Sequence, residues 1–289
     1  MNIDIICPLY YAEKYIESLN DSIFRQKDVM IHSVQYILTE CNDKTEEILQ
    51  KLQVKNDKIR YSQIKKEEFS HSLTRETAAM QSKADILVFI SQDIDIKRDD
   101  WLCHLVQPII ENEADACFSK QVTKYNNIEK YIREKNYPQE SYTVTKNSLD
   151  TMGMRAFFFS DASSCIKTEI FQKLKGYDGK NLPTNEDQYI AYKLIMNGYR
   201  IQYCSDSEVY HSHEFTLKEL YKRYYDTGVF YAQNNYLDQY GTTKTGGGLA
   251  KYVLVRAIQD KNWKVLLRFV PDMSARFLGM KLGKMKAGK

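Results

Sequence analysis

Two carboxylates stand two positions apart directly after the most apolar run of the chain. Asp93 and Asp95 follow residues 85–90, whose sequence is Asp-Ile-Leu-Val-Phe-Ile. A short apolar run of this kind predicts a buried strand. Carboxylates spaced in this way can converge on one hard cation, and Mg²⁺ or Mn²⁺ held by one or two carboxylates keeps positions open for phosphate oxygens. The pair therefore predicts a divalent-metal site, with a solvated turn as the alternative.

A second pair of acids, Glu186 and Asp187, opens a predicted helix over residues 186–197. Acids are common in a first helical turn because they complement the helix dipole, and this is the plain structural interpretation. The functional interpretation is a general base at the mouth of a site. Such a base could deprotonate an acceptor hydroxyl.

Two histidines and one arginine are also suited to a metal or phosphate site. His211 and His213 end an extended stretch, in which residues i and i+2 point to the same face. Either imidazole could contact a metal or a phosphate, or both could be structural. Arg75 begins a predicted helix after a polar loop, against the dipole preference, which a diphosphate ligand would explain. An ordinary surface salt bridge is the alternative for Arg75.

Alternating elements in the first half would position these residues. We expect strands at residues 3–7, 34–38, 59–61 and 85–90, and helices at 12–27, 44–52 and 74–83. This order predicts an α/β fold with a mostly parallel sheet and helices on both faces. Ligands of such sheets bind beyond the carboxyl ends of the strands. Residues 8–11, 39–43 and 91–95 are therefore expected to line the site.

The second half is less regular. It predicts strands at residues 116–122 and 156–160, helices at 168–174 and 186–197, and extended segments at 200–203 and 208–213. From Thr216 onward the pattern is helical, with interruptions expected at residues 246–248 and at Pro271. We therefore expect a catalytic domain over residues 1–215 and a helical, basic extension over residues 216–289.

Basic residues gather at the C-terminus. The formal net charge of the chain is only +3, but residues 261–289 hold eight Lys or Arg and a single acid, Asp272. Apolar residues such as Trp263 and Phe277 lie among them, so a helix here could rest on an anionic bilayer. The competing interpretation is an interface in a homo-oligomer. No nucleic-acid-binding pattern accompanies these charges, so we expect no nucleic-acid partner.

Cysteines and apolar runs indicate the compartment. The six cysteines are scattered without a C-x-x-C pair, which predicts a reducing environment and no zinc site. No run approaches the ~18 apolar residues of a membrane span. Asp4 and Pro8 interrupt the first apolar run, so no signal peptide is expected. These features predict a cytoplasmic protein that is peripheral on the inner face of the plasma membrane.

Taken in order, these residues resemble the family 2 glycosyltransferases. Pro8-Leu9-Tyr10-Tyr11, followed by Leu19, Ser22-Ile23 and Gln26, is similar to that family's P-x-Y-N…L-x-x-S-I-x-x-Q pattern, with Tyr11 in the Asn place. The similarity is closest to bacterial rhamnosyltransferases and covers roughly residues 1–230. It rests on Ser91-Gln92-Asp93 with Trp101-Leu102, Phe69…His71…Thr74-Arg75, Ser160-Asp161, Glu186-Asp187-Gln188, residues 209–213, and Arg223-Tyr224…Asp226-Thr227-Gly228.

The resemblance implies a GT-A fold, an inverting reaction, and Mn²⁺ or Mg²⁺ as cofactor. Asp187 is implied as the catalytic base, with Glu186 and Asp161 in the acceptor pocket. The metal ligands that it implies are Asp93, Asp95 and His211. The donor-binding residues that it implies are Pro8, Tyr10, Glu40, Arg75, Gln92 and Asp93.

The implied donor is dTDP-L-rhamnose, and the implied acceptor is a saccharide, expected to be lipid-linked, in the synthesis of bacterial cell-surface polysaccharide. A UDP-sugar donor and a non-catalytic nucleotide- or sugar-binding scaffold are the alternatives. Retention of Asp93, Asp95 and Asp187 together argues against the scaffold. Two departures from the family stand out: residues 39–43 read Thr-Glu-Cys-Asn-Asp where the family often has Asp-Asp or Asp-Ser, and Glu76 follows Arg75 where the family has Asn.

Overall fold

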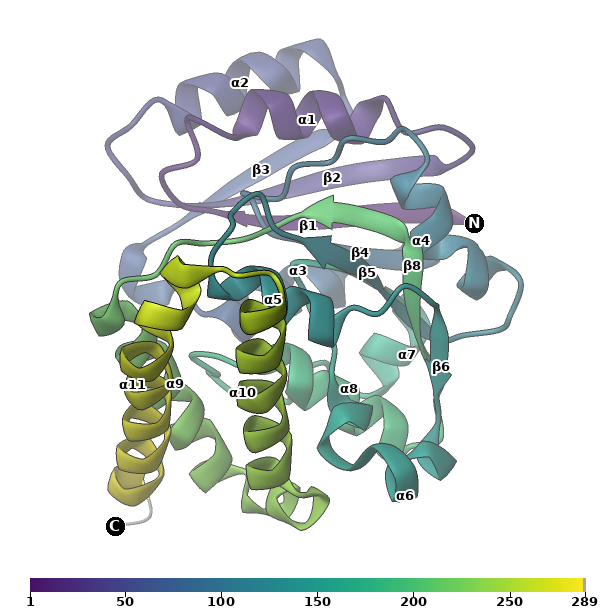
Figure 1. The fold of residues 1–289 in the computed structure, drawn as a ribbon. Helices are drawn as coiled ribbons and strands as arrows, with labels where there is room; N and C mark the ends of the chain where they lie inside the picture. The colour runs from purple at the N-terminus through teal and green to yellow at the C-terminus, as the bar shows by residue number, and fades with distance from the viewer. Residues whose placement is uncertain (288–289) are drawn as a thin grey trace.

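The computed structural model describes residues 1–287, without the side chains of residues 242–246. Its centre is one eight-stranded sheet in the order β3-β2-β1-β4-β7-β5-β8-β6 (Figure 1). Strands β1 to β5 and β8 run in one direction, and β6 and β7 run in the other. The strands are β1 (Asn2–Leu9), β2 (Met30–Thr39), β3 (Ile59–Ile64), β4 (Ile86–Ile90), β5 (Ala116–Val122), β6 (Tyr142–Val144), β7 (Ser163–Lys167) and β8 (Ile201–Tyr210).

Helices cover both faces of this sheet (Figure 1). Alternate residues of β4 serve the two faces, because side chains in a strand alternate: Val88 packs with the core that contains α1 and α4, and Phe89 with the core that contains α3 and α8. The expected α/β class with a mostly parallel sheet is confirmed. The helices are α1 (Ile16–Phe24), α2 (Thr45–Lys55), α3 (His71–Gln81), α4 (Trp101–Ile110), α5 (Ile128–Asn136), α6 (Leu149–Met152), α7 (Thr168–Lys173), α8 (Glu186–Met196), α9 (Leu217–Gln233), α10 (Thr242–Gln259) and α11 (Trp263–Ala287).

The strand expected at residues 156–160 is wrong. Residues 153–157 form a 3₁₀ turn, and the strand of this region is β7, which lies antiparallel between β4 and β5. The sequence of β7 begins with two serines, which gives it no apolar alternation. Ser163 is nevertheless buried. Its polar hydroxyl is satisfied there, because it pairs with the hydroxyl of Ser119 at 2.6 Å and accepts from the Trp101 indole at 3.1 Å. The two extended segments predicted at 200–203 and 208–213 are one continuous strand, β8.

The C-terminal helices break at other places than the sequence predicts. Residues 246–248 lie inside α10, and Pro271 lies inside α11; the chain turns instead at residues 260–262. A proline inside a helix costs about 3 kcal/mol, and the packing of α11 along α9 offsets it. Gly279 and Gly283 face the backbone of Tyr221 and Tyr225 so closely that a Cβ at either glycine would overlap the carbonyl oxygen.

A buried ion cluster fastens α11 to the body. Arg276 donates to Asp272 at 2.6 Å, to Glu129 of α5 at 2.9 Å, and to the Tyr224 hydroxyl of α9 at 2.7 Å. All three charged residues are buried, so Arg276 is a structural cation rather than part of the basic surface predicted for this end. Within the described residues, no helix is long and apolar enough to cross a membrane.

Candidate active site

One carboxylate and two imidazoles converge beyond the ends of β4 and β8. The Oδ1 atom of Asp93 lies 3.5 Å from Nε2 of His211, and its Oδ2 atom lies 3.5 Å from Nε2 of His213. The three ligand atoms lie within 4.8 Å of one another. A backbone bridge between Asp95 and Tyr210, with N–O distances of 2.9 and 3.0 Å, holds the loop after β4 against the end of β8. This bridge is the reason that residues 118 positions apart in the chain meet.

The side chain of Gln121 sets the tautomer of His211. Its Oε1 atom lies 3.0 Å from Nδ1 of His211 and also accepts from Arg133, while its Nε2 donates to the Ser160 hydroxyl at 2.7 Å. An acceptor oxygen facing Nδ1 places a proton there, and in the neutral imidazole the Nε2 lone pair of His211 then faces Asp93. A metal-binding histidine is commonly oriented by a hydrogen bond of this kind to its second nitrogen.

Asp95, predicted as a metal ligand, is held apart from this group. Its carboxylate accepts from Lys97 at 2.8 Å and from Lys124. Burial would raise the pKa of Asp95, but the two ammonium groups outweigh it and lower the pKa. The structure thus brings together Asp93, His211 and His213, and it directs the carboxylate of Asp95 to two lysines.

The predicted donor residues Pro8, Tyr10 and Gln92 lie at the ends of β1 and β4, which are neighbours in the sheet. The Gln92 side chain ties the two ends together, because it accepts from the Tyr10 amide at 2.7 Å and donates to the Tyr10 carbonyl at 2.9 Å. The Tyr10 ring is exposed, and the amine of Lys66 lies 5.8 Å from its centre. An exposed aromatic ring next to a cation is suited to a nucleotide.

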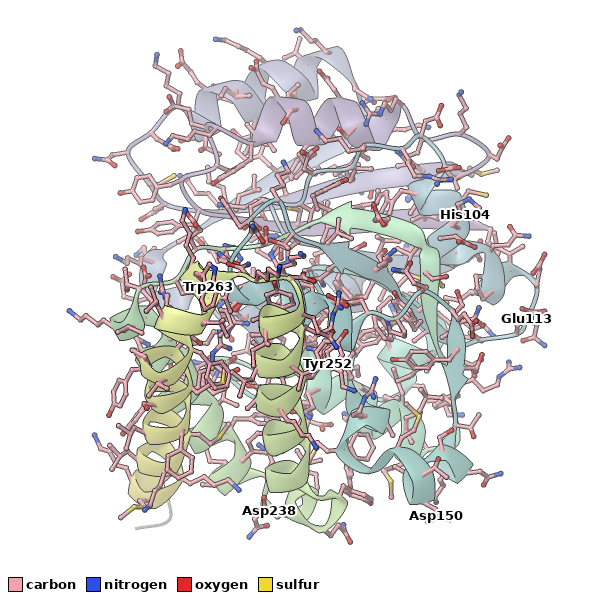
Figure 2. The ribbon with its side chains drawn as sticks, viewed as in Figure 1. His104, Glu113, Asp150, Asp238, Tyr252 and Trp263 are labelled. Carbon is pink, nitrogen blue, oxygen red and sulfur yellow. The ribbon has the colours of Figure 1, made fainter. Side chains whose placement is uncertain are left out.

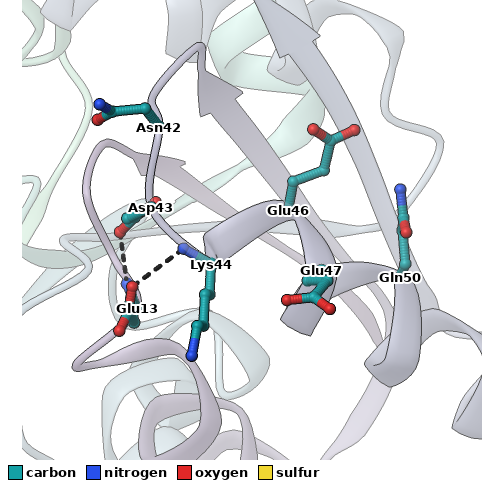
Figure 3. Close-up of a pocket in the computed structure, with 7 residues that line it drawn as sticks. All are labelled: Glu13, Asn42, Asp43, Lys44, Glu46, Glu47 and Gln50. Carbon is teal, nitrogen blue, oxygen red and sulfur yellow. Dashed lines mark hydrogen bonds between the residues drawn. The ribbon is translucent and has the colours of Figure 1, made fainter.

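Glu40 is exposed immediately after β2, and its backbone amide donates to Ile64 at 2.9 Å. Beyond it, a hollow of about 420 Å³ lies over the start of α2 (Figure 3). Its lining includes four acids and one lysine, so its charge disfavours an anionic diphosphate. The hollow is lined by Glu13, Asn42, Asp43, Lys44, Glu46, Glu47 and Gln50.

Arg75 is not at a helix start, contrary to the prediction. Helix α3 begins four residues earlier, at His71, because the Ser70 hydroxyl caps it by accepting from the Leu73 amide at 3.2 Å. The Arg75 side chain is only 5% exposed and points at Glu186, with 3.4 Å between Nη1 and Oε1. It therefore neutralises a buried acid of the predicted acceptor pocket.

Asp161, also predicted for that pocket, is 2% exposed. Its carboxylate accepts from the Tyr177 hydroxyl at 2.7 Å and from the Ser164 hydroxyl at 2.9 Å. Burial raises the pKa of Asp161 above its ordinary value. Both carboxylate oxygens of Asp161 accept from protein hydroxyls, so this side chain links β7 to the loop that carries Tyr177 and supports the wall of the pocket.

Asp187 is the acid of this group that keeps access to solvent. It is half-buried in the first turn of α8, and its Oδ1 atom accepts from the Gln188 amide at 2.7 Å. Burial, together with the negative charges of Glu186 and Asp161, raises the pKa of Asp187 well above the ordinary value of an aspartate. A carboxyl with a raised pKa in a pocket is a good proton acceptor for a hydroxyl.

Arg223 of α9 joins the two halves of the site electrostatically. Its guanidinium lies 5.6 Å from the ring centre of Phe215. Burial is the largest influence on two nearby groups, raising the pKa of Asp187 and lowering that of His213; the positive charge of Arg223 opposes the first shift and adds to the second. Arg223 is exposed. The residue type and position of Arg223 predict no role in the site, although it lies within the segments that carry the resemblance.

Comparison with known proteins decides the family. The pattern of glycosyl transferase family 2 matches residues 4–175, which is more than half of the chain. The chain belongs to glycosyl transferase family 2. Among curated proteins, it is 28% identical to the O-antigen chain rhamnosyltransferase RfbN of Salmonella typhimurium, over 98% of this chain and 90% of RfbN. It is 29% identical to the O-antigen chain rhamnosyltransferase WbaN of Salmonella anatum, over 75% of this chain and 70% of WbaN.

Solved structures confirm the fold of this family 2 glycosyltransferase. Staphylococcus aureus TarS (residues 1–349, in complex with UDP-GlcNAc) matches with a TM-score of 0.64 at 17% identity, over 97% of this chain and 91% of that one. The mannosyltransferase PcManGT from Pyrobaculum calidifontis, in complex with GDP-Man and Mn²⁺, matches with a TM-score of 0.63 at 14% identity, over 99% and 86%. At such identities the likeness shows a shared fold, which is the expected GT-A architecture.

The departure from the family at Glu76 has a structural explanation. Its carboxylate accepts from the backbone amides of Tyr177 and Gly179, the latter at 3.1 Å. These amides belong to the turn between α7 and the segment that leads to α8. Glu76 therefore supports the loop that carries Glu186 and Asp187 to the site.

Proposed function

We propose that this family 2 glycosyltransferase transfers L-rhamnose from dTDP-L-rhamnose to a saccharide acceptor with inversion, in the synthesis of a bacterial surface polysaccharide. The convergence of Asp93, His211 and His213, at the loop whose Gln92 holds Tyr10, supports a metal-assisted transfer site. The similarity to two O-antigen chain rhamnosyltransferases, one along nearly the whole chain, supports the sugar.

The donor set of the Asp93 group fits a divalent cation. It offers one carboxylate oxygen and two imidazole nitrogens, and the orientation of His211 leaves a lone pair directed at Asp93. Mg²⁺ prefers oxygen ligands and water, whereas imidazole suits transition metals, so this set favours Mn²⁺. When bound, the cation neutralises charge that develops on the leaving diphosphate. We propose His213 as a ligand in the position that the sequence assigned to Asp95.

The donor would lie along the ends of β1 and β4. Pro8 and Tyr10 would contact the nucleoside, and the Gln92 side chain would fix the Tyr10 loop that receives it. Glu40 would face the nucleoside from the end of β2. Because Arg75 is buried against Glu186, we assign contact with the diphosphate to Arg223, an exposed cation of α9 whose charge acts on both Asp187 and His213.

Asp187 would act as the base. The acceptor hydroxyl attacks the anomeric carbon from the side opposite the diphosphate and gives its proton to the Asp187 carboxylate. The bond between that carbon and the diphosphate oxygen breaks in the same step, which inverts the centre and releases dTDP. Glu186, held by Arg75, would accept a hydrogen bond from the acceptor sugar, and Asp161 would support the pocket from behind.

The acceptor is proposed to be lipid-linked, which would place the enzyme on the inner face of the plasma membrane. We propose residues 1–215 as the catalytic domain and residues 216–289 as a helical extension that serves this location. The extension shares its apolar contacts with the body, because Val253, Ala257 and Val265 pack with Ile128 and Tyr131 of α5. A homo-oligomer through the C-terminal helices is the competing use of the extension.

Calorimetric binding of dTDP, UDP and GDP, each with Mn²⁺ and with chelator, tests the donor and the metal together. We expect dTDP to bind most tightly and only with Mn²⁺. Preference for UDP would keep the site and replace the donor with a UDP-sugar. Absence of binding to all three nucleotides would contradict the catalytic proposal and favour a scaffold.

A further inference from the structure

Helix α11 carries an apolar stripe that the rest of the chain leaves uncovered. Its most exposed members are Leu267, at 83%, and Trp263, at 70%, and Val270, Phe277 and Met285 continue it. Their spacing returns to one side of an α-helix. From residue 263 to residue 285 the stripe is roughly 33 Å long at 1.5 Å per residue. An exposed apolar stripe of this length, interrupted on its own side of the helix by Lys281, marks an interaction surface.

The exposed charges of α11 itself have one sign. The single acid of α11, Asp272, is buried and paired with Arg276. Four basic side chains of α11 remain exposed, namely Lys264, Arg268, Lys281 and Lys286. The partner that fits this face is therefore apolar at its centre and negative at its edge. Two copies of the chain that met through the same face would oppose their lysines, because a two-fold interface places like surfaces together.

A hollow of about 310 Å³ lies at the Trp263 end of the stripe, between α5 and the turn from α10 to α11. Figure 2 labels Trp263 at the start of α11. Lys130, Lys261 and Lys264 line it, against one carboxylate, Asp260, which pairs with Lys130 at 2.9 Å. The Asn262 amide donates to Asn126 at 3.0 Å and to the Tyr131 hydroxyl at 3.2 Å. The exposed amines of Lys261 and Lys264 are therefore the groups that suit a phosphate.

We propose that the α11 face and this hollow form a docking surface for an anionic phospholipid bilayer. The apolar stripe enters the acyl boundary, the lysines contact headgroup phosphates, and Trp263 lies at the interface, where indole rings are favoured. α11 is 25 residues long but is not apolar enough to span the membrane, which is consistent with a helix lying in the plane of the surface.

The docking surface begins beside the active site. Arg268 donates to the carbonyl of Phe215, two residues after His213. α11 then runs along α9, away from the carboxyl ends of the strands (Figure 1). Docking would therefore hold the site next to the bilayer. That use of the surface, to meet a lipid-linked acceptor, rests on the proposed function; the binding to lipid does not.

Trp263 gives a direct measurement on the full-length chain. The chain has two tryptophans, and Trp101 is fully buried, so a change of solvent alters the emission of Trp263 alone. We expect its emission to shift to shorter wavelength with phosphatidylcholine vesicles containing about one-third phosphatidylglycerol, and not with pure phosphatidylcholine. Trp263→Phe should abolish the shift while leaving co-sedimentation with the anionic vesicles nearly intact.

Two double variants test the stripe and the charges by co-sedimentation. Leu267→Glu with Phe277→Glu should reduce binding at least tenfold, whereas Val54→Glu, at an exposed position of α2, should not. Lys264→Glu with Lys281→Glu should also reduce binding at least tenfold, because each lysine near an anionic surface contributes about fivefold. Lys51→Glu is its control, at an exposed lysine of α2.

Equal binding to both kinds of vesicle, or undiminished binding of both double variants, would overturn the proposal. So would a dimer of the wild-type chain that Leu267→Glu with Phe277→Glu dissociates, because the face would then belong to a second copy. Vesicle binding needs neither donor nor acceptor. A chain that docks without transferring sugar would refute only the proposed function, and the reverse result would refute only the docking surface.

Discussion

Asp187 has the chemistry of a base that is easily protonated. Burial and the neighbouring charges of Glu186 and Asp161 raise its pKa. The pairing of Arg75 with Glu186 reduces the electrostatic repulsion among these three carboxylates. A higher pKa strengthens the carboxylate as a proton acceptor, provided that the working pH keeps enough of it ionised. The same environment makes the ionised form costly for the fold.

Replacing Asp187 with Asn separates these two effects. We expect kcat to fall by about 10²–10⁴-fold, the usual contribution of a general base. The melting temperature should stay the same or rise, because the variant removes an acid whose ionisation opposes folding. Steady-state kinetics and thermal unfolding measure the two quantities. A folded Asp187→Asn variant that retains full activity would exclude Asp187 as the base.

The raised pKa of Asp187 also predicts the acid limb of the pH profile. Because the base must be ionised, kcat/KM should rise with pH and level off only well above pH ~4, the range of an ordinary aspartate. The stability contribution has the opposite sign: a folded-state pKa above the unfolded value favours the fold at low pH, and this advantage is lost as the pH rises through the folded pKa. The free energy of unfolding of Asp187→Asn should lack this decrease with rising pH. A rate that is already constant near pH 4 would contradict the assignment.

Substitution tests the proposed metal ligands one by one. His211→Ala and His213→Ala should each lower Mn²⁺ affinity at least tenfold, and Gln121→Ala should lower it by about 10–100-fold through the orientation of His211. Asp95→Asn is the matched comparison, because the Asp95 carboxylate is engaged by Lys97 and Lys124. Calorimetry with Mn²⁺ measures all four. Equal losses for Asp95→Asn and His213→Ala would restore Asp95 as a ligand.

Residue types identified much of the site, but not its geometry. Asp93, His211 and Asp187 were named from their positions after strands and at a helix start, and the structure brings Asp93 and His211 together. The directions of Arg75 and Asp95 depend on contacts with Glu186 and Lys124, which are 111 and 29 positions away along the chain. No local pattern encodes such partners.

At the scale of elements, strands with a strong apolar signal were predicted well, as β4 and β5 illustrate. β7 was missed because its stability comes from serine hydroxyl contacts with Ser119 and Trp101 on other elements. α11 was predicted to break at Pro271, and its packing on α9 outweighs the local penalty. In both elements tertiary contacts decide against local preference.

The contact between α9 and α11 predicts a sharp difference among glycines. Gly279→Ala or Gly283→Ala should destabilise the chain by about 1–3 kcal/mol, because the new methyl group would overlap the backbone of α9. Gly247→Ala in α10 is the control: none of the described atoms lies within 4 Å of a Cβ at Gly247, and alanine should stabilise that helix by about 0.5–1 kcal/mol. Chemical denaturation measures the differences. Equal effects at Gly279 and Gly247 would exclude close packing of these helices.

At the scale of the whole molecule, the candidate site residues lie beyond the carboxyl ends of the parallel strands. The C-terminal helices begin near these strand ends. The α/β class and the basic character of the C-terminus could be predicted from the sequence. The burial of Arg276 could not, because its partner Glu129 lies on α5, far away in the chain. The arrangement predicts an enzyme whose transfer site and lipid-docking face work on the same acceptor.

Transfer of labelled rhamnose from dTDP-L-rhamnose into lipid-extractable saccharide, by the full-length chain with Mn²⁺, tests this function most directly. We expect label in the lipid fraction, lost when the metal is chelated and lost in Asp187→Asn. Transfer that continues unchanged with chelator or in Asp187→Asn would contradict the proposed mechanism. Transfer from a UDP-sugar but not from dTDP-L-rhamnose would contradict the proposed donor.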